Sequence, residues 1–400
     1  MDEHVFFPCL TPQPADPLLS LGQIAAADRR PSRLDLSVGI YRDEAGTTPV
    51  MRAVKAAERM LAETQPSKAY LGVEGNGAFR AQIGSLILPG VAEGDIVSVQ
   101  TPGGTGALRL AADLLAAGKP DRVIWVGTPT WSNHLPVFAA ARLEARCFPH
   151  FDMASQSLLV DRMIATIDAA APGDAFLLQP LCHNPTGADL AASDLALIAD
   201  RMAARGIIPL IDVAYHGFGA SLGEDSARLR PLLDRLPDAL LVYSCSKNFG
   251  LYRERVGALF CVNKGGALRE LLSGNLQALA RANHSMPPDH GAAVVATILG
   301  DAGLRADWER ELAAMVARVR AVRTALADHG RVGAIDLAPI ASQSGMFSLL
   351  PLDADLVARL RHDHAVYIPA SGRINIAGLA ADRVEDFVRA LDQAQMRSAA

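Results

Sequence analysis

The part of the chain from about residue 95 to 262 alternates short apolar runs with longer amphipathic stretches. Near-continuous hydrophobic strands separated by helical patterns are typical of a mostly parallel sheet that helices cover on both faces. We therefore predict an α/β fold. The predicted strands are DIVSVQ (95–100), RVIWVG (122–127), AFLLQP (175–180), IIPLID (207–212), ALLVYS (239–244) and GALFCV (257–262).

The remaining periodic segments predict helices and a second structural unit. We expect a large domain over residues 46–310 and a smaller α+β domain over 311–400 that includes a long interdomain helix. Residues 1–45 are expected to form an N-terminal arm and part of the small domain. The predicted helices span 104–117, 189–205, about 288–328 and 381–395, and short strands are expected within 345–350, 365–370 and 373–378.

Charge and cysteine usage narrow the range of partners. The formal net charge of −5 disfavours a nucleic-acid-binding surface, so we expect small molecules and a second copy of the chain as partners. Five scattered cysteines without CxxC spacing indicate neither a disulfide framework nor a zinc site, and we predict no metal site. The acidic, proline-rich start is unlike a signal peptide, and no run reaches the roughly 18 apolar residues of a membrane helix. We therefore expect no membrane partner and a cytoplasmic location.

A glycine-rich turn, TPGGTGALR, follows the first predicted strand. Ligands of open parallel sheets bind outside the carboxyl ends of the strands. Gly104 lets the backbone approach an anion, and Thr105 and the free N–H groups of the next helix face it. Such turns are common and often have no ligand, and the spacing does not match the GxGxxG dinucleotide pattern. A phosphate site is one interpretation of this turn.

Polar and aromatic residues follow the next three strands. Trp131 and His134 come after 122–127, Asn184 after 175–180, and Asp212 and Tyr215 at the end of 207–212. Each also has an ordinary structural interpretation, as a core tryptophan, a capping histidine, a turn asparagine, a helix-capping aspartate or a buried tyrosine. Asp212 is the most informative, because a carboxylate beside so apolar a run is costly to bury without a donor partner.

The stretch YSCSKNFGLYRERVG places Lys247 at the end of the fifth strand. An isolated lysine there is usually a solvated charge. Here Ser244 lies close in sequence, and Arg255 can reach an anion held by the glycine-rich turn. A lysine amine, a phosphate clamp, a buried carboxylate and a flat aromatic ring together meet the needs of pyridoxal phosphate.

Motifs along nearly the whole chain strengthen this interpretation, and their order is more specific than any one of them. The chain resembles the aspartate and aromatic amino-acid aminotransferases, which are fold-type-I pyridoxal-phosphate enzymes. The resemblance implies a large domain on a mostly parallel sheet of the seven-stranded type, plus a smaller α+β domain from the N- and C-terminal segments. The motifs are DLSVGIYRDEAG, KAYLGVEG, TPGGTGALR, TPTWSNH, CHNPTGADL, DVAYHGFG, SCSKNFGLYRERVG, RANHSMPPDHGA, GMFS and SGRINIAG.

The resemblance also implies how pyridoxal 5'-phosphate is held. Lys247 would bind the cofactor as a Schiff base and carry the proton between the substrate α-carbon and the cofactor. Asp212, supported by His134, would pair with the ring nitrogen, and Trp131 would stack on the ring. The remaining cofactor contacts implied are Tyr215 and Asn184 to the ring oxygen, and Gly104, Thr105, Ser244, Arg255 and the neighbouring subunit's Tyr70 to the phosphate.

For the substrate, the resemblance implies a site shared between two subunits, and hence a homodimer. Arg373 would bind the α-carboxylate as a bidentate fork. Arg281 from the partner would meet the distal carboxylate of a dicarboxylic substrate. The other implied substrate contacts are Gly39, Ile40, Trp131, Asn184 and Met286.

The chain departs from its relatives at Gln179, His216, His284 and Met286. A thioether beside Arg281 makes that end of the pocket more apolar, which favours an aromatic side chain, whereas Arg281 itself favours a dicarboxylate. We therefore predict a ping-pong aminotransferase that moves the amino group of tyrosine, phenylalanine, tryptophan and aspartate to 2-oxoglutarate. The alternatives are an aspartate-selective aminotransferase, a β-decarboxylase or lyase of the same fold, and a non-catalytic pyridoxal-binding regulator.

Overall fold

A seven-stranded sheet forms the centre of the computed structural model, which describes residues 10–12 and 15–396. Its order is β2-β10-β9-β8-β7-β3-β4, and only β10 runs antiparallel to its neighbours. The mostly parallel α/β sheet is thus confirmed. The strands are β2 (Ile96–Pro102), β3 (Val123–Thr128), β4 (Glu144–Pro149), β7 (Ala175–Leu178), β8 (Ile208–Val213), β9 (Asp238–Ser244) and β10 (Val256–Asn263).

The sequence analysis missed the strand β4. It lies at the edge of the sheet and most of its residues are exposed or half-buried. Its sequence, EARCFP, therefore lacks the apolar run by which the other strands were found.

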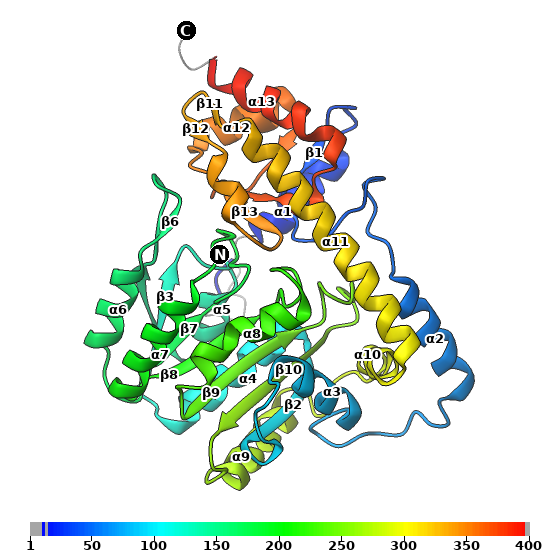
Figure 1. Cartoon of the computed structure of the whole chain (residues 1–400), viewed down its shortest axis with the longest axis vertical. Helices are drawn as coiled ribbons and strands as arrows, with labels where there is room; N and C mark the ends of the chain where they lie inside the picture. Colours follow the sequence, from blue (N-terminus) through cyan, green and yellow to red (C-terminus); the bar gives the residue numbers. More distant parts are fainter. Residues whose placement is uncertain (1–9, 13–14, 397–400) are drawn as a thin grey trace, which may run out of the picture.

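Helices cover both faces of the sheet, as predicted (Figure 1). Alternate strand residues enter two separate apolar cores, so that Leu177 and Leu210 face one core while Phe176 and Ile211 face the other. One core packs against α4 (Gly103–Gly118), α5 (His134–Ala140) and α9 (Arg269–Asn283). The other packs against α3 (Gly77–Ile87), α6 (Val160–Ala169), α7 (Ala192–Arg205), α8 (Leu222–Leu233) and α10 (His290–Gly300).

The prediction of one helix over 288–328 was wrong. The structure has α10 and then α11 (Ala302–Asp328), with Asp301 between them in an extended conformation. The Asp301 Oδ1 atom accepts a hydrogen bond from the N–H of Leu304 at 2.9 Å and so caps α11. This N-cap marks the beginning of a new helix, which the apolar periodicity of the sequence did not reveal.

A short strand of the N-terminal segment pairs with one of the C-terminal segment above the sheet (Figure 1). Strand β1 (Leu34–Asp35) is parallel to β14 (Val366–Tyr367), and β13 (Phe347–Leu349) is antiparallel to β15 (Arg373–Asn375). The predicted domain boundary at 310/311 lies inside α11. The domain boundaries stay predictions. The other elements are α1 (Pro17–Ala27), α2 (Arg52–Thr64), β5 (Phe151–Asp152), β6 (Ser157–Leu158), β11 (Arg331–Val332), β12 (Ile335–Asp336), α12 (Ala354–His364), α13 (Val384–Met396) and four short 3₁₀ turns at Glu93–Asp95, Ala338–Ser342, Ile376–Gly378 and Ala381–Arg383.

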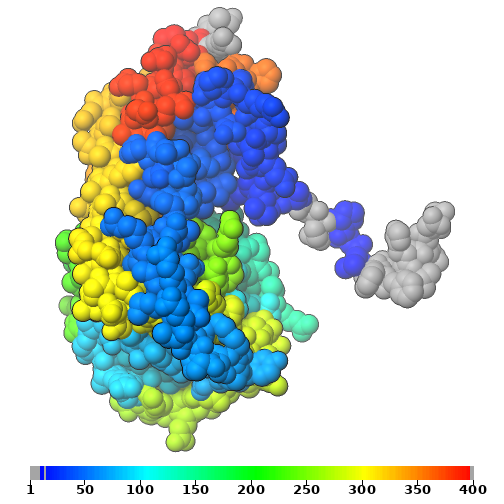
Figure 2. Space-filling model, turned by 90° about the vertical axis from the view of Figure 1, so that its right-hand side faces the viewer, coloured from blue at the N-terminus to red at the C-terminus, as the bar shows by residue number. Residues whose placement is uncertain are grey.

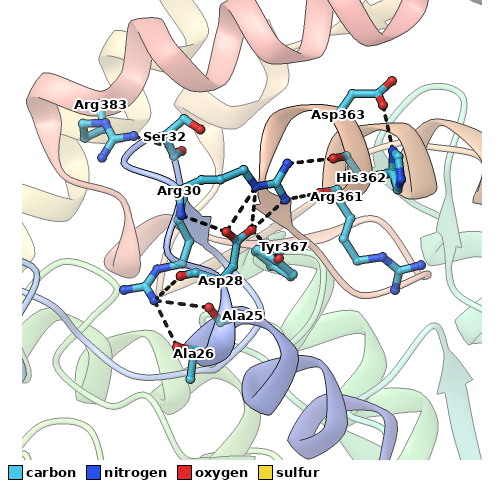
Figure 3. A network of polar contacts seen from close by, with 11 residues as sticks. Ala25, Ala26, Asp28, Arg30, Ser32, Arg361, His362, Asp363, Tyr367 and Arg383 are labelled. Carbon is cyan, nitrogen blue, oxygen red and sulfur yellow. Dashed lines mark hydrogen bonds and ion pairs between the residues drawn. The ribbon is translucent and has the colours of Figure 1, made fainter.

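A polar network fastens the N-terminal segment to the C-terminal one (Figure 3). The carboxylate of Asp28, just after α1, accepts hydrogen bonds from the Arg30 guanidinium and from the Tyr367 hydroxyl, the latter at 2.7 Å. Arg30 Nη1 in turn donates to the carbonyl of His362 at 2.7 Å. The Arg30 hydrogen bonds lower the pKa of Asp28. In Figure 2 the blue N-terminal part and the red C-terminal part lie side by side.

No helix in the described ranges 10–12 and 15–396 is both long enough and apolar enough to cross a membrane.

A buried cation ties α11 to the strand β13. Arg323 is 2% exposed, and its guanidinium donates to the Ser348 hydroxyl at 2.8 Å. It also donates to the carbonyls of Ser344, Gly345 and Phe347 at 2.6 to 2.9 Å. Burial lowers the pKa of Arg323 to about 10.

Replacing this arginine should therefore destabilise the fold. We expect Arg323→Leu to lower the free energy of unfolding by about 3 kcal/mol, because buried carbonyl groups lose their donors. Urea denaturation measures the change. Arg310→Leu on the same helix is the control, since the Arg310 side chain is 66% exposed, and its effect should stay within about 0.5 kcal/mol. Equal effects of the two substitutions would contradict the role given to Arg323.

Candidate active site

A cavity of about 210 Å³ lies where the carboxyl ends of β8 and β9 meet the N-terminus of α4. It brings together residues that the sequence analysis selected from six separate segments. Those lining it are Gly39, Gly104, Thr105, Trp131, Asn184, Asp212, Tyr215, Ser244, Lys247 and Arg255. Larger cavities exist, including one of about 650 Å³ beside α3 and α8, but none of the predicted site residues lines that cavity. The chemistry therefore points to the smaller cavity.

Lys247 lies just beyond the last residue of β9 and lines this cavity. Its Nζ atom is 4.8 Å from the centroid of the Tyr215 ring. The pKa of Lys247 is lowered to about 8, chiefly by burial and also by the nearby guanidinium groups of Arg255 and Arg373, while the Asp212 carboxylate acts against this shift. The amine thus has a sizeable neutral, nucleophilic fraction near neutral pH.

Asp212 ends the buried strand β8 with three hydrogen-bond donors around its carboxylate. Oδ2 accepts from Gln179 Nε2 at 3.0 Å and lies 3.2 Å from His134 Nε2, while Oδ1 accepts from the N–H of Ala214 at 3.1 Å. His134 Nδ1 lies 2.7 Å from the Thr130 hydroxyl. Because a carboxylate only accepts, His134 Nε2 carries a proton and donates it to Asp212. These partners support a buried negative charge that faces the cavity.

An anion site lies at the N-terminus of α4. Gly103 has a φ of +70°, and a Cβ atom there would lie 2.5 Å from Arg255 Nη2, so only glycine fits. The Arg255 guanidinium is oriented by the Tyr252 carbonyl at 3.0 Å and the Ser246 hydroxyl at 3.4 Å. With Ser244, a helix N-terminus, an arginine and hydroxyl groups converge, which is how proteins bind phosphate. The sequence analysis gave Ser246 no ligand contact.

Arg373 of β15 presents a second cation close by. It is 6% exposed, and Nη1 donates to Asn184 Oδ1 at 3.2 Å while Nη2 donates to the Ser37 carbonyl at 2.6 Å. Its guanidinium lies 4.4 Å from the centroid of the Phe347 ring. Its Nε atom has no acceptor, and it has no ion pair, among the residues that the structure describes. A buried guanidinium without an anion is suited to bind the carboxylate of a ligand.

Comparison with known proteins agrees with this geometry. The family model "Aminotransferase class I and II" matches residues 31–391. The chain belongs to the class I and II aminotransferases. It is 50% identical over 374 residues to a tyrosine aminotransferase of Rhizobium meliloti, which covers 93% of this chain and 96% of the relative. It is 40% identical to an aspartate aminotransferase of Salmonella typhi, over 96% of this chain and 99% of the relative.

A solved structure is similar throughout. It is an aromatic-amino-acid aminotransferase from Burkholderia pseudomallei covalently bound to pyridoxal phosphate. Its TM-score to this aminotransferase is 0.93 at 34% sequence identity, and the match covers 97% of this chain and 99% of that chain.

Six predicted site residues of this aminotransferase do not line the 210 Å³ cavity. His134 and Arg373 contact the lining residues Asp212 and Asn184. The other four are Ile40, Tyr70, Arg281 and Met286. Ile40 follows Gly39, and its carbonyl accepts from Asn375 Nδ2 at 2.8 Å. Tyr70 is 93% exposed and Arg281 is also exposed. Met286 is half-buried, and its Sδ atom accepts a hydrogen bond from the N–H of Leu71 at 3.0 Å. The last contact ties the segments that carry Tyr70 and Arg281 to each other.

A directed chain of hydrogen bonds lies behind Lys247. Asn248 Nδ2 donates to the Tyr243 hydroxyl at 2.8 Å, which lies 3.1 Å from His216 Nδ1. His216 Nε2 lies 3.0 Å from the Leu222 carbonyl. Because a carbonyl only accepts, Nε2 carries the proton and Nδ1 accepts from Tyr243. Burial lowers the pKa of His216 to about 4, so the ring is neutral, and the hydrogen bonds through Tyr243 hold Asn248, the residue after the lysine.

The low pKa of Lys247 is testable in the protein freed of cofactor. Competitive labelling with acetic anhydride should show Lys247 reaching half-maximal reactivity near pH 8 rather than near the ordinary lysine value of 10.5. Asp212→Asn should move this midpoint to a still lower pH, because the carboxylate that favours the charged amine is gone. A midpoint above pH 10 in the unaltered protein would contradict the burial of the amine.

Proposed function

We propose that this aminotransferase binds pyridoxal 5'-phosphate in the 210 Å³ cavity and moves the amino group of aromatic amino acids and of aspartate to 2-oxoglutarate. One observation carries the proposal. A lysine with a lowered pKa, a carboxylate that accepts three hydrogen bonds and an anion site all lie at one cavity. The names of the relatives, which include tyrosine and aspartate aminotransferases, support the choice of substrates. The absence of a disulfide among the described cysteines fits a cytoplasmic location.

The residues present fit this cofactor. Gly103 leaves room at the helix N-terminus, and Arg255 and Ser244 would hold the phosphate with Gly104 and Thr105. Asp212, backed by His134, would accept a hydrogen bond from a protonated ring nitrogen. Trp131 would lie against the ring, and the Tyr215 hydroxyl, which accepts from Asn184 Nδ2 at 3.1 Å, would meet its oxygen together with Asn184.

Once bound, pyridoxal phosphate supplies a carbonyl for the amino group and a ring that withdraws electrons from the substrate α-carbon. Lys247 would anchor that carbonyl, and its displaced amine would take the proton from the α-carbon and return it later as general base and acid. Arg373 would fix the substrate α-carboxylate, so that the α-proton faces Lys247. Gly39 and Ile40 would help to exclude water from the site.

We further propose a homodimer in which each subunit completes the other's site. Tyr70 and Arg281 are exposed and away from their own cavity, yet the contact of Met286 with Leu71 holds their segments together. A phenol and a guanidinium on one surface are the groups that a phosphate and a distal carboxylate need. Met286 adds an apolar contact beside Arg281, which supports acceptance of aromatic as well as dicarboxylic substrates.

A donor panel tests the function. We expect tyrosine, phenylalanine, tryptophan and aspartate each to convert the visible absorption of the cofactor-loaded protein, and 2-oxoglutarate to restore it. Lys247→Ala should slow the conversion by at least about 10³-fold, because the proton carrier is lost. Response to aspartate alone would favour an aspartate-selective enzyme. Formation of alanine and carbon dioxide from aspartate, without oxaloacetate, would contradict transamination.

Subunit mixing tests the shared site. Lys247→Ala and Arg281→Ala homodimers should each be almost inactive with aspartate. A mixture that has exchanged subunits should regain roughly a quarter of the activity per site, because half of the dimers are hybrids with one intact site. Activity no greater than the sum of the two parents would show that Arg281 serves its own subunit or none.

A further inference from the structure

Gln179 forms the wall between the active-site cavity and a second, smaller cavity. The smaller cavity has a volume of about 20 Å³, and Gln179 lines both it and the cavity that holds Lys247. Apolar side chains such as Leu177 and Met163 form part of its lining. The polar side chains that line it are Thr130, His150, Gln179 and His183.

Two of these polar side chains have atoms that no described protein group satisfies. The Gln179 side chain uses Nε2 for the Asp212 carboxylate, and its Oε1 atom is buried without a donor. His150 is 4% exposed, and its ring nitrogens form no hydrogen bond of good geometry with the described protein, although the backbone of Thr128 lies near enough to raise the pKa of the ring slightly against the effect of burial. The ring lies against Gly127, where a Cβ atom would come within 2.8 Å of His150 Cγ. The chain therefore keeps space for a polar ring next to the cavity.

Physical chemistry narrows what occupies this space. A buried polar group without a hydrogen-bond partner is destabilising, so unsatisfied atoms on both side chains at one cavity favour an occupant that forms hydrogen bonds. A cavity of roughly 10–15 Å³ or slightly more holds one water molecule, which fits this volume. Across the described part of the chain, no cluster of three histidine, cysteine or acidic side chains could hold a metal ion. Burial lowers the pKa of His150 to about 4, so the neutral ring offers one donor and one acceptor.

We propose that one buried water molecule bridges Gln179 Oε1 and the His150 ring, and that it makes His150 a positioning residue for Asp212. The water donates to Oε1 and so fixes the amide with Nε2 toward the carboxylate. A flipped amide would place Oε1 against Asp212, oxygen against oxygen. His150 thus acts on the site through the water and Gln179, although it does not line the active-site cavity.

A high-resolution crystal structure of the holoenzyme tests the water directly. We expect one density peak within hydrogen-bonding distance of Gln179 Oε1 and a His150 nitrogen. An empty cavity, or a peak that contacts only one of the two, would overturn the proposal. This result does not depend on the proposed function, because the peak is expected whether or not the protein is loaded with pyridoxal phosphate.

Variants test the positioning role, which does rest on the proposed function. His150→Phe should remove the water and raise the dissociation constant of pyridoxal phosphate by about tenfold, as loss of outer partners does at other sites. His150→Gln keeps a hydrogen-bonding group, so this variant should retain the water and the affinity for pyridoxal phosphate. Met163→Leu changes an apolar side chain that lines the same small cavity, so the water and the affinity for pyridoxal phosphate should stay unchanged. Loss of the water in His150→Phe with unaltered affinity would disprove the positioning role, whereas no pyridoxal phosphate binding by any form would count against the proposed function.

Discussion

A buried carboxylate at the end of a buried strand is the constraint on which the rest of the site depends. Asp212 is 4% exposed, and a charge in such a place is tolerated only when donors surround it. Gln179, His134 and the N–H of Ala214 provide these donors. Each comes from a different segment, so three parts of the chain must meet for the Asp212 carboxylate to receive its hydrogen bonds.

The parallel sheet brings the opposing amine to this carboxylate. Strands β8 and β9 are neighbours, with Asp212 opposite Val242, so that the segments leaving both strands emerge at one edge. Lys247 follows β9 at that edge, where the carboxylate and two guanidinium groups shift its pKa in opposite directions. The antiparallel strand β10 then sets Val256 opposite Pro102, which brings Arg255 to the start of α4. The anion site is thus a consequence of one strand that runs against the others.

The segments from the two ends of the chain close the remaining side. Arg373 is held by the Ser37 carbonyl and by Asn184, which are 336 and 189 residues away in sequence. Phe347 supports this arrangement, because its ring lies beside both Arg373 and Tyr215. Arg323 in turn holds the strand that carries Phe347. A substrate carboxylate bound by Arg373 would therefore be coupled to α11 through packed side chains and backbone carbonyls.

The sequence by itself determined the central strands and the chemical groups at their ends. Apolar runs mark buried strands, and Asp212 and Lys247 stand directly after such runs, so their position at the ligand-binding edge followed from local pattern alone. The edge strand β4 and the break at Asp301 escaped this reasoning, because neither has an apolar signature. Only the tertiary structure decided that Gln179 binds Asp212, that Ser246 orients Arg255, and that Asn184 contacts Arg373. The physical reason is that these are single hydrogen bonds between segments that the folded backbone brings together, and such contacts leave no periodicity in the sequence.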